Sequence, residues 1–277
     1  MDSILTTENV TKRFGRTVAL DEVSFQIPGG LSMLLGPNGS GKTTFLRIAC
    51  GLLVPDEGEV KIFGHDPYHE YGEIIDRVSF ALQKPHLPQN ITVRDFLEGV
   101  KTEKNTRSYT GAVKAFGLED MLDKKFKHLS GGFKKRVSLA QAFIGKPDLI
   151  IVDEPFANLD IEAKLRISDM INDLSEKEDT SLVVITHDLG SLEPDHLTIL
   201  YAGKTILSDH YRDLGFDDIR SFILEKEDDT ITVTDKKELH KHIKDGAEII
   251  DVEKRNFENY LKEKFEEGEI NKGSSIR

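Results

Sequence analysis

The glycine-rich segment of residues 36–44, with the sequence GPNGSGKTT, carries the residues best suited to chemistry. The phosphate-binding pattern G-x-x-x-x-G-K-[ST] is filled here by Gly36, Gly41, Lys42 and Thr43. Glycines let backbone N–H groups converge on a phosphate chain, and a helix that begins at Lys42 adds partial positive charge at the same point. Lys42 would reach the β- and γ-phosphates, and the Thr43 hydroxyl would bind Mg²⁺. The segment therefore predicts a nucleotide-phosphate site.

The residues around this segment predict a strand before it and a helix after it. Leu31 to Leu35 form an apolar run, and Phe45, Leu46 and Ala49 follow the loop at helical spacing. A strand, a loop and a helix in this order are the setting that the pattern requires. We assign the whole loop to the nucleotide: Gly36, Pro37, Asn38, Gly39, Ser40, Gly41, Lys42, Thr43 and Thr44.

Two carboxylates follow a second apolar run, Leu149 to Val152. A continuous apolar run is typical of a parallel central strand with both faces covered. Asp153 and Glu154, at the carboxyl end of this run, would cost stability unless they served a metal or a reaction. We expect Asp153 to hold Mg²⁺, directly or through water, and Glu154 to orient or deprotonate an attacking water.

Gln83 and His187 each stand at the carboxyl end of another predicted strand. Gln89 lies further out in the loop, so we choose Gln83, because ligands of open α/β sheets bind at the carboxyl ends of the strands. A lone histidine after a strand is usually structural. Here four predicted strands would deliver Gly36, Gln83, Asp153 with its neighbour, and His187 to one edge of one sheet, and this coincidence favours a shared site.

A second helix whose first turn lacks bulky side chains is predicted to begin after Leu129. Ser130 is a natural N-cap, and Gly131 and Gly132 leave the first turn without side chains. Alone, this pattern is most often a plain capped helix, but in a chain that already has a phosphate loop it indicates a second anion site. Phe14 stands in a polar turn, where a flat ring could stack on adenine or cover the edge of a small sheet.

The composition limits the class of protein. The chain has 277 residues and a formal net charge of −12, which argues against a nucleic-acid surface and against a direct electrostatic hold on anionic lipid. The single cysteine, Cys50, falls in an apolar helical pattern, so we expect a small buried residue in a reducing compartment. No signal-peptide pattern and no stretch as long as a membrane span appear in the sequence. We expect a cytoplasmic protein without direct membrane insertion.

The order of these motifs resembles that of the ATP-binding subunits of ABC transporters, over about residues 4–210. The resemblance implies that the nucleotide is ATP and that Phe14 stacks on its adenine. It makes Ser130, Gly131 and Gly132 the signature motif, which contacts the γ-phosphate of the opposite subunit. It makes Asp160 a D-loop residue and Gln83 the Q-loop glutamine, which we assign to Mg²⁺ with Thr43 and Asp153.

The same resemblance implies an activity and partners. The activity is ATP hydrolysis, and the catalytic candidates are Glu154, His187, Lys42 and Gln83. The partners are a second ATP-binding subunit in a head-to-tail homodimer and an integral membrane permease, which would place the chain on the inner face of the cell membrane. One departure is Phe133, where the family often has glutamine; we expect ATP binding to survive it.

The expected fold is an α/β P-loop NTPase core with a parallel central sheet, an N-terminal antiparallel β subdomain and a helical subdomain at about residues 91–146. We expect the ATP-binding domain to span residues 1–210. Residues 211–277 predict a small α/β appendage, with strands at 231–234 and 247–252, helices at 236–243 and 257–265, and a disordered tail. Such appendages occur in exporter-type members of the family, which slightly favours export.

Two alternatives remain open at this point. The first is a soluble ATPase of the same superfamily, with an assembly or regulatory role and no permease. The second is a degenerate cassette that binds nucleotide without turnover, which the presence of both Glu154 and His187 disfavours. The sequence does not specify the transported substrate, because in this family the permease selects it.

Overall fold

The computed structural model describes residues 3–83, 87–157, 159, 161–177, 180–187, 192, 194–211, 220–226, 229–233 and 248–254. The chain divides into two compact units, Met1–Ser208 and Asp209–Arg277. Among the described residues, none of the helices combines the length and the apolar character that crossing a bilayer requires.

The first unit is built on a six-stranded sheet in the order β5-β6-β7-β3-β8-β9. The strands are β3 (Leu31–Leu35), β5 (Val78–Ala81), β6 (Leu149–Asp153), β7 (Ser181–Thr186), β8 (His196–Tyr201) and β9 (Lys204–His210). From β5 to β8 all neighbouring pairs are parallel. Every residue of β3 and β6 is buried, as their continuous apolar runs predict. The predicted parallel central sheet is confirmed.

A three-stranded antiparallel sheet forms the N-terminal subdomain. It pairs β1 (Leu5–Phe14) with β2 (Thr17–Ile27) on one side and with β4 (Glu57–Ile62) on the other. Helix α1 (Lys42–Ala49) packs its apolar face on this sheet, and the rings of Phe25 and Phe45 meet edge to face at 5.1 Å. This contact holds the start of α1, and with it the phosphate loop, between the two sheets.

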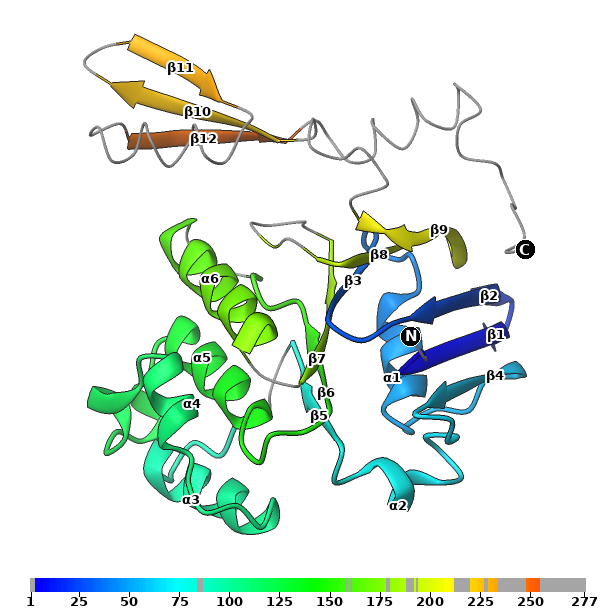
Figure 1. The fold of residues 1–277 in the computed structure, drawn as a ribbon, viewed down its shortest axis with the longest axis horizontal. Helices are drawn as coiled ribbons and strands as arrows, with labels where there is room; N and C mark the ends of the chain where they lie inside the picture. Colours follow the sequence, from blue (N-terminus) through cyan, green and yellow to red (C-terminus); the bar gives the residue numbers. More distant parts are fainter. Residues whose placement is uncertain are drawn as a thin grey trace. The chain divides into compact units, whose positions relative to one another are not determined.

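Four further helices lie on the other side of the central sheet from α1 (Figure 1). They are α3 (Val93–Glu103), α4 (Thr110–Ala115), α5 (Gly131–Ala142) and α6 (Ile161–Lys177), with short 3-10 turns at Glu119–Met121 and Phe126–His128, while α2 (Tyr71–Ile74) precedes β5. Thr92 caps α3, because its Oγ1 accepts a hydrogen bond from the Asp95 N–H at 3.1 Å.

In its described residues the second unit is an antiparallel sheet in the order β11-β10-β12. The strands are β10 (Arg220–Lys226), β11 (Asp229–Val233) and β12 (Glu248–Lys254). Strands β11 and β12 overlap the two predicted strands, whereas the sequence pattern does not predict β10. The predicted helices at 236–243 and 257–265 and the predicted tail lie outside the described residues.

Candidate functional site

The topology of the central sheet places four predicted site segments at one edge. Strands β5, β6, β7 and β3 are parallel neighbours in this order, so their carboxyl ends share that edge. The residues that follow them are, in the same order, Gln83, Glu154, His187 and Gly36. The coincidence expected from the sequence is therefore present in the fold.

A cleft of about 280 Å³ opens at this edge. The phosphate loop contributes Asn38, and the ends of β5, β6 and β7 contribute Gln83, Glu154 and His187; the lining is completed by Phe156, Ala157, Lys164 and Thr186. Four residues that the sequence singled out thus line one cavity, in which polar side chains predominate.

The phosphate loop is held by its own lysine. Lys42 is 7% exposed, and its Nζ donates hydrogen bonds to the carbonyl oxygens of Gly36 at 2.6 Å and Pro37 at 3.0 Å. Burial lowers the pKa of Lys42, and the charges of Asp153 and Glu154 oppose that shift, so the amine lies close to both carboxylates.

Two glycines of the loop have no room for a side chain. A Cβ on Gly36 would lie 2.2 Å from the carbonyl oxygen of Leu200, and one on Gly41 would lie 2.6 Å from the carbonyl oxygen of Ala19. Gly41 also has φ of 104°, which side-chain-bearing residues rarely adopt. The packing beneath the loop thus requires glycine at these two positions, and it leaves this part of the loop without side chains.

The carboxyl end of β6 carries the two buried carboxylates. Asp153 and Glu154 are 8% and 7% exposed. Burial, with a further contribution from the charge of Glu154, raises the pKa of Asp153. A backbone hydrogen bond from Gln83 to Asp153 opposes this shift, so the end of β5 is in direct contact with that carboxylate.

Glu154 is fixed from several directions. Its N–H donates to the carbonyl oxygen of Ile185 at 2.7 Å, and its carboxylate accepts from the Thr186 hydroxyl at 3.2 Å and pairs with His187 Nδ1 at 2.9 Å. The φ of Glu154 is 45°, in the left-handed region, which a residue with a side chain rarely adopts. Pro155 follows it, and a proline further restricts the backbone of the residue before it. Strain of this kind is typical of functional positions, where the surrounding structure holds it in place.

The signature segment starts α5 as the sequence predicts. Ser130 caps the helix, with its Oγ 3.4 Å from the Phe133 N–H. Ser130 and Gly131 are exposed, and a Cβ on Gly131 would meet nothing within 4 Å. These residues do not line the cleft, so within one chain they are not part of the same cavity as Glu154. Asp160 lies outside the described residues.

Phe14 ends β1 with 47% of its surface exposed. The Lys12 ammonium lies 5.9 Å from the centre of its ring. The ring is therefore not part of the core, and it is available to a planar partner, although it does not line the cleft.

Sequence reasoning missed three residues at this site. Lys135 is 7% exposed and donates to the backbone carbonyl of Asp153 at 3.0 Å, while Thr186 and Lys164 line the cleft. Helix α5 buries Lys135 and Ser138 together with the apolar residues Val137, Leu139 and Ala140. No local sequence signal marks Lys135, because the carbonyl that its amine binds lies at the end of β6, distant in the sequence.

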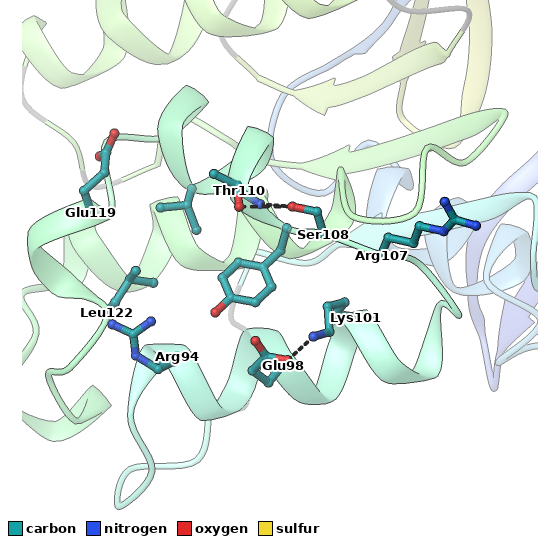
Figure 2. Close-up of a pocket in the computed structure, with 10 residues that line it drawn as sticks. Arg94, Glu98, Lys101, Arg107, Ser108, Thr110, Glu119 and Leu122 are labelled. Carbon is teal, nitrogen blue, oxygen red and sulfur yellow. Dashed lines mark hydrogen bonds and ion pairs between the residues drawn. The ribbon is translucent and has the colours of Figure 1, made fainter.

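A second pocket, of about 300 Å³, lies between α3 and the segment that leads into α4 (Figure 2). Arg94, Glu98, Lys101, Arg107, Ser108, Thr110, Glu119 and Leu122 lie around it. Glu98 forms an ion pair with Lys101, and Arg94 pairs with Asp123 at 2.9 Å. The pocket contains none of the predicted site residues, and its charges partly neutralise one another, so we assign it no chemistry.

Comparison with known proteins shows the family to which this chain belongs. The family model described as "ABC transporter" matches residues 20–157. The zinc import ATP-binding protein ZnuC of Rickettsia bellii (strain RML369-C) is 34% identical over 187 residues, which cover 67% of this chain and 77% of that protein. This chain belongs to the ABC transporter ATP-binding proteins. It is therefore a nucleotide-binding ATPase and a subunit of a transporter.

Solved structures of such ATPases share the fold. The ADP conformation of MJ1267, an ATP-binding cassette of an ABC transporter, matches with a TM-score of 0.66 and 25% identity, covering 77% of this chain and 93% of that one. The dimeric structure of MJ0796, a bacterial ABC transporter cassette, matches with a TM-score of 0.67 and 26% identity, covering 74% and 98%. The predicted fold class is confirmed.

The thiol of this ATPase is expected to be inert in the folded protein. Burial, with a further contribution from Asp153, raises the pKa of Cys50 to about 12. At pH 7.5 the thiolate fraction is then about three orders of magnitude below that of an ordinary thiol. We expect iodoacetamide to alkylate Cys50 at least about a hundredfold more slowly in buffer than in denaturant, as followed by intact mass. Equal rates would show that the thiol is accessible.

Proposed function

We propose that two copies of this chain bind two ATP molecules between them, head to tail, and hydrolyse them to drive a membrane permease. The observation that carries this proposal is the cleft at the sheet edge. It brings Asn38 of the phosphate loop together with Gln83, Glu154 and His187, and Glu154 and His187 are hydrogen-bonded to each other.

In the proposed reaction a water attacks the γ-phosphate in line with the bond to the β-phosphate. Glu154 accepts a proton from this water or orients it, and His187 holds the Glu154 carboxylate through Nδ1 and faces the γ-phosphate. Lys42 exchanges its bonds to Gly36 and Pro37 for phosphate oxygens. Catalysis is then mainly positioning and electrostatic stabilisation of the phosphoryl group in transfer.

Residues at the same edge suit Mg²⁺. Mg²⁺ prefers oxygen ligands, and Asp153 offers a buried carboxylate whose raised pKa reflects its unfavourable burial as an anion. Thr43 is exposed at the start of α1, and Gln83 contacts Asp153 through its backbone. We propose Thr43, Gln83 and Asp153 as the residues that hold the ion. When bound, it would neutralise charge on the β- and γ-phosphates.

The second subunit supplies the signature segment. Ser130 and Gly131 present the exposed amino end of α5, where backbone N–H groups attract an anion. This helix start lies outside its own chain's cleft, which favours a phosphate held by a partner. A dimeric ABC cassette among the structural relatives supports the same arrangement.

The permease is proposed to dock beside Gln83. Leu82 and Ile91, on either side of the segment that carries this glutamine, are 41% and 37% exposed, and exposed apolar side chains are frequent at binding surfaces. This contact would place the ATPase on the inner face of the cell membrane. For the direction of transport, the C-terminal unit favours export, whereas the relative ZnuC is named an import protein.

A pull-down from the membranes of the native cells tests this proposal. The tagged protein is expected to recover an integral membrane protein in stoichiometric amount, whose sequence would indicate substrate and direction. Leu82→Glu should lose that partner, whereas Val18→Glu, at a residue that is 46% exposed on β2, should keep it. Recovery of soluble partners alone would favour a soluble ABC-type ATPase instead.

Phe14→Ala tests the adenine contact. Stacking of a base on an aromatic ring contributes about 1–3 kcal/mol, so we expect ATP affinity to fall about fivefold to a hundredfold. Affinity for inorganic triphosphate, which has no base, should not change. Titration of both ligands against the wild type and the variant measures the difference, and equal losses for the two ligands would remove the ring from adenine binding.

A further inference from the structure

We propose that Lys135 is a positioning residue for ATP hydrolysis: from the signature helix it clamps the peptide group that joins Asp153 to Glu154 and so fixes the Glu154 carboxylate. The inference rests on the proposed function, because it concerns how Glu154 acts on water. Lys135 does not itself line the cleft, and so it acts only through this peptide.

The peptide between Asp153 and Glu154 is held at both of its polar atoms. Its carbonyl oxygen accepts a hydrogen bond from Lys135 Nζ at 3.0 Å, and its N–H donates to the carbonyl oxygen of Ile185 at 2.7 Å. These two bonds come from opposite neighbours, helix α5 and strand β7. Rotation of the peptide plane would break both bonds.

The clamp acts where the backbone is strained. Glu154 has φ of 45°, in the left-handed region that sterically disfavours residues with a side chain. Such a conformation persists only when surrounding contacts impose it. Without the bond from Lys135, only the bond to Ile185 would restrain this peptide, and a rotation of the peptide would turn the Glu154 side chain away from His187 and Thr186.

The choice of lysine adds a charge to the clamp. Lys135 is 7% exposed, and burial lowers its pKa to about 8, while the charges of Asp153 and Glu154 oppose that shift. A buried cation beside two buried carboxylates offsets part of the repulsion between them. Lys42 also interacts with both carboxylates, but it has to turn to the phosphates in the proposed reaction.

The bond from Lys135 also connects the signature segment, which would contact the partner's ATP, to Glu154, which acts on the ATP of its own chain. Ser130 caps the helix that carries Lys135, and the two residues are less than two helical turns apart. A shift of α5 on contact with the partner's ATP would therefore be transmitted to Glu154 of the same chain. Binding of the partner's ATP would in this way change the position of Glu154, the residue that acts on water.

Three variants of the full chain test the inference by steady-state ATPase kinetics and fluorescent-ATP titration. Lys135→Met keeps the length of the side chain but removes the donor, and it should lower kcat by on the order of tenfold while KM and nucleotide affinity stay within about twofold. Lys135→Gln keeps an N–H donor and should recover kcat to within about threefold of the wild type. Val137→Ala, a buried change on the same helix, controls for lost stability.

The possible outcomes separate the positioning role of Lys135 from the proposed function. Unchanged kcat in Lys135→Met, or a loss no larger than that of Val137→Ala at equal folded fraction, would overturn the positioning role and leave the proposed function intact. A parallel loss of nucleotide affinity would assign Lys135 to binding instead. A wild type without ATPase activity would overturn both proposals.

Discussion

Glu154→Gln is expected to bind ATP with unchanged affinity and to hydrolyse it about 10²–10⁴ times more slowly than the wild type. The substitution keeps the size and the hydrogen-bonding oxygen of a side chain that is 7% exposed and bonded to His187 and Thr186. It removes only the negative charge that accepts or attracts the proton of the attacking water. Because binding survives and turnover does not, the variant should also accumulate as an ATP-bound dimer.

Phosphate release and size-exclusion chromatography with ATP measure these two effects. Glu59→Gln is a matched control, because Glu59 is an exposed carboxylate on β4 whose partner is Lys61. We expect the control to behave as wild type in both assays. Wild-type turnover by Glu154→Gln would remove Glu154 from its proposed role.

Gly131→Asp is expected to leave the fold and the binding of one nucleotide intact, but to lower ATP hydrolysis by about 10²–10³. A Cβ at Gly131 meets nothing within 4 Å in its own chain, so the new side chain fits. In the proposed dimer it would face the partner's γ-phosphate, where two like charges at about 4 Å repel by about 4 kcal/mol at an effective dielectric constant of 20. The loss should therefore appear only in reactions that need the dimer.

Gly111→Asp is the matched control for this change. Gly111 also lies in the first turn of an exposed helix start, and a Cβ there likewise meets nothing within 4 Å. Thermal unfolding and ATPase assays on both variants separate a folding defect from a catalytic one. Equal activity of the two variants would show that the signature segment contacts no phosphate.

Much of the central sheet could be predicted because its strands are covered on both faces. The runs that became β3, β6 and β7 contain only apolar residues over most of their length, which few other structures require. Parallel strands then bring their carboxyl ends together, so the sequence alone is enough to assign Gln83, Glu154 and His187 to one edge. The predicted N-cap Ser130 follows from local chemistry and is confirmed.

Other features depend on contacts distant in sequence. Lys135 is buried because the carboxyl end of β6 offers its amine a carbonyl and two carboxylates, and no local pattern encodes that neighbour. The left-handed backbone of Glu154 is held by two bonds to its peptide, one from Lys135 on α5 and one to Ile185 on the adjacent strand. Strand β10 begins and ends with charged residues and has only three consecutive apolar residues between them, so periodicity alone does not separate it from a loop.

Mixing two inactive variants tests the central claim, that each ATP site is shared between two copies of this chain. Lys42→Ala disables the phosphate loop, and Gly131→Asp disables the signature segment, so each homodimer should be inactive. A mixed head-to-tail dimer contains one chain of each variant. One of its ATP sites then carries both substitutions, and the other site carries neither. An equimolar mixture is then expected to recover up to about a quarter of wild-type ATPase activity, since about half of the dimers are mixed and each has one intact site. A mixture no more active than the sum of its components would contradict the shared site.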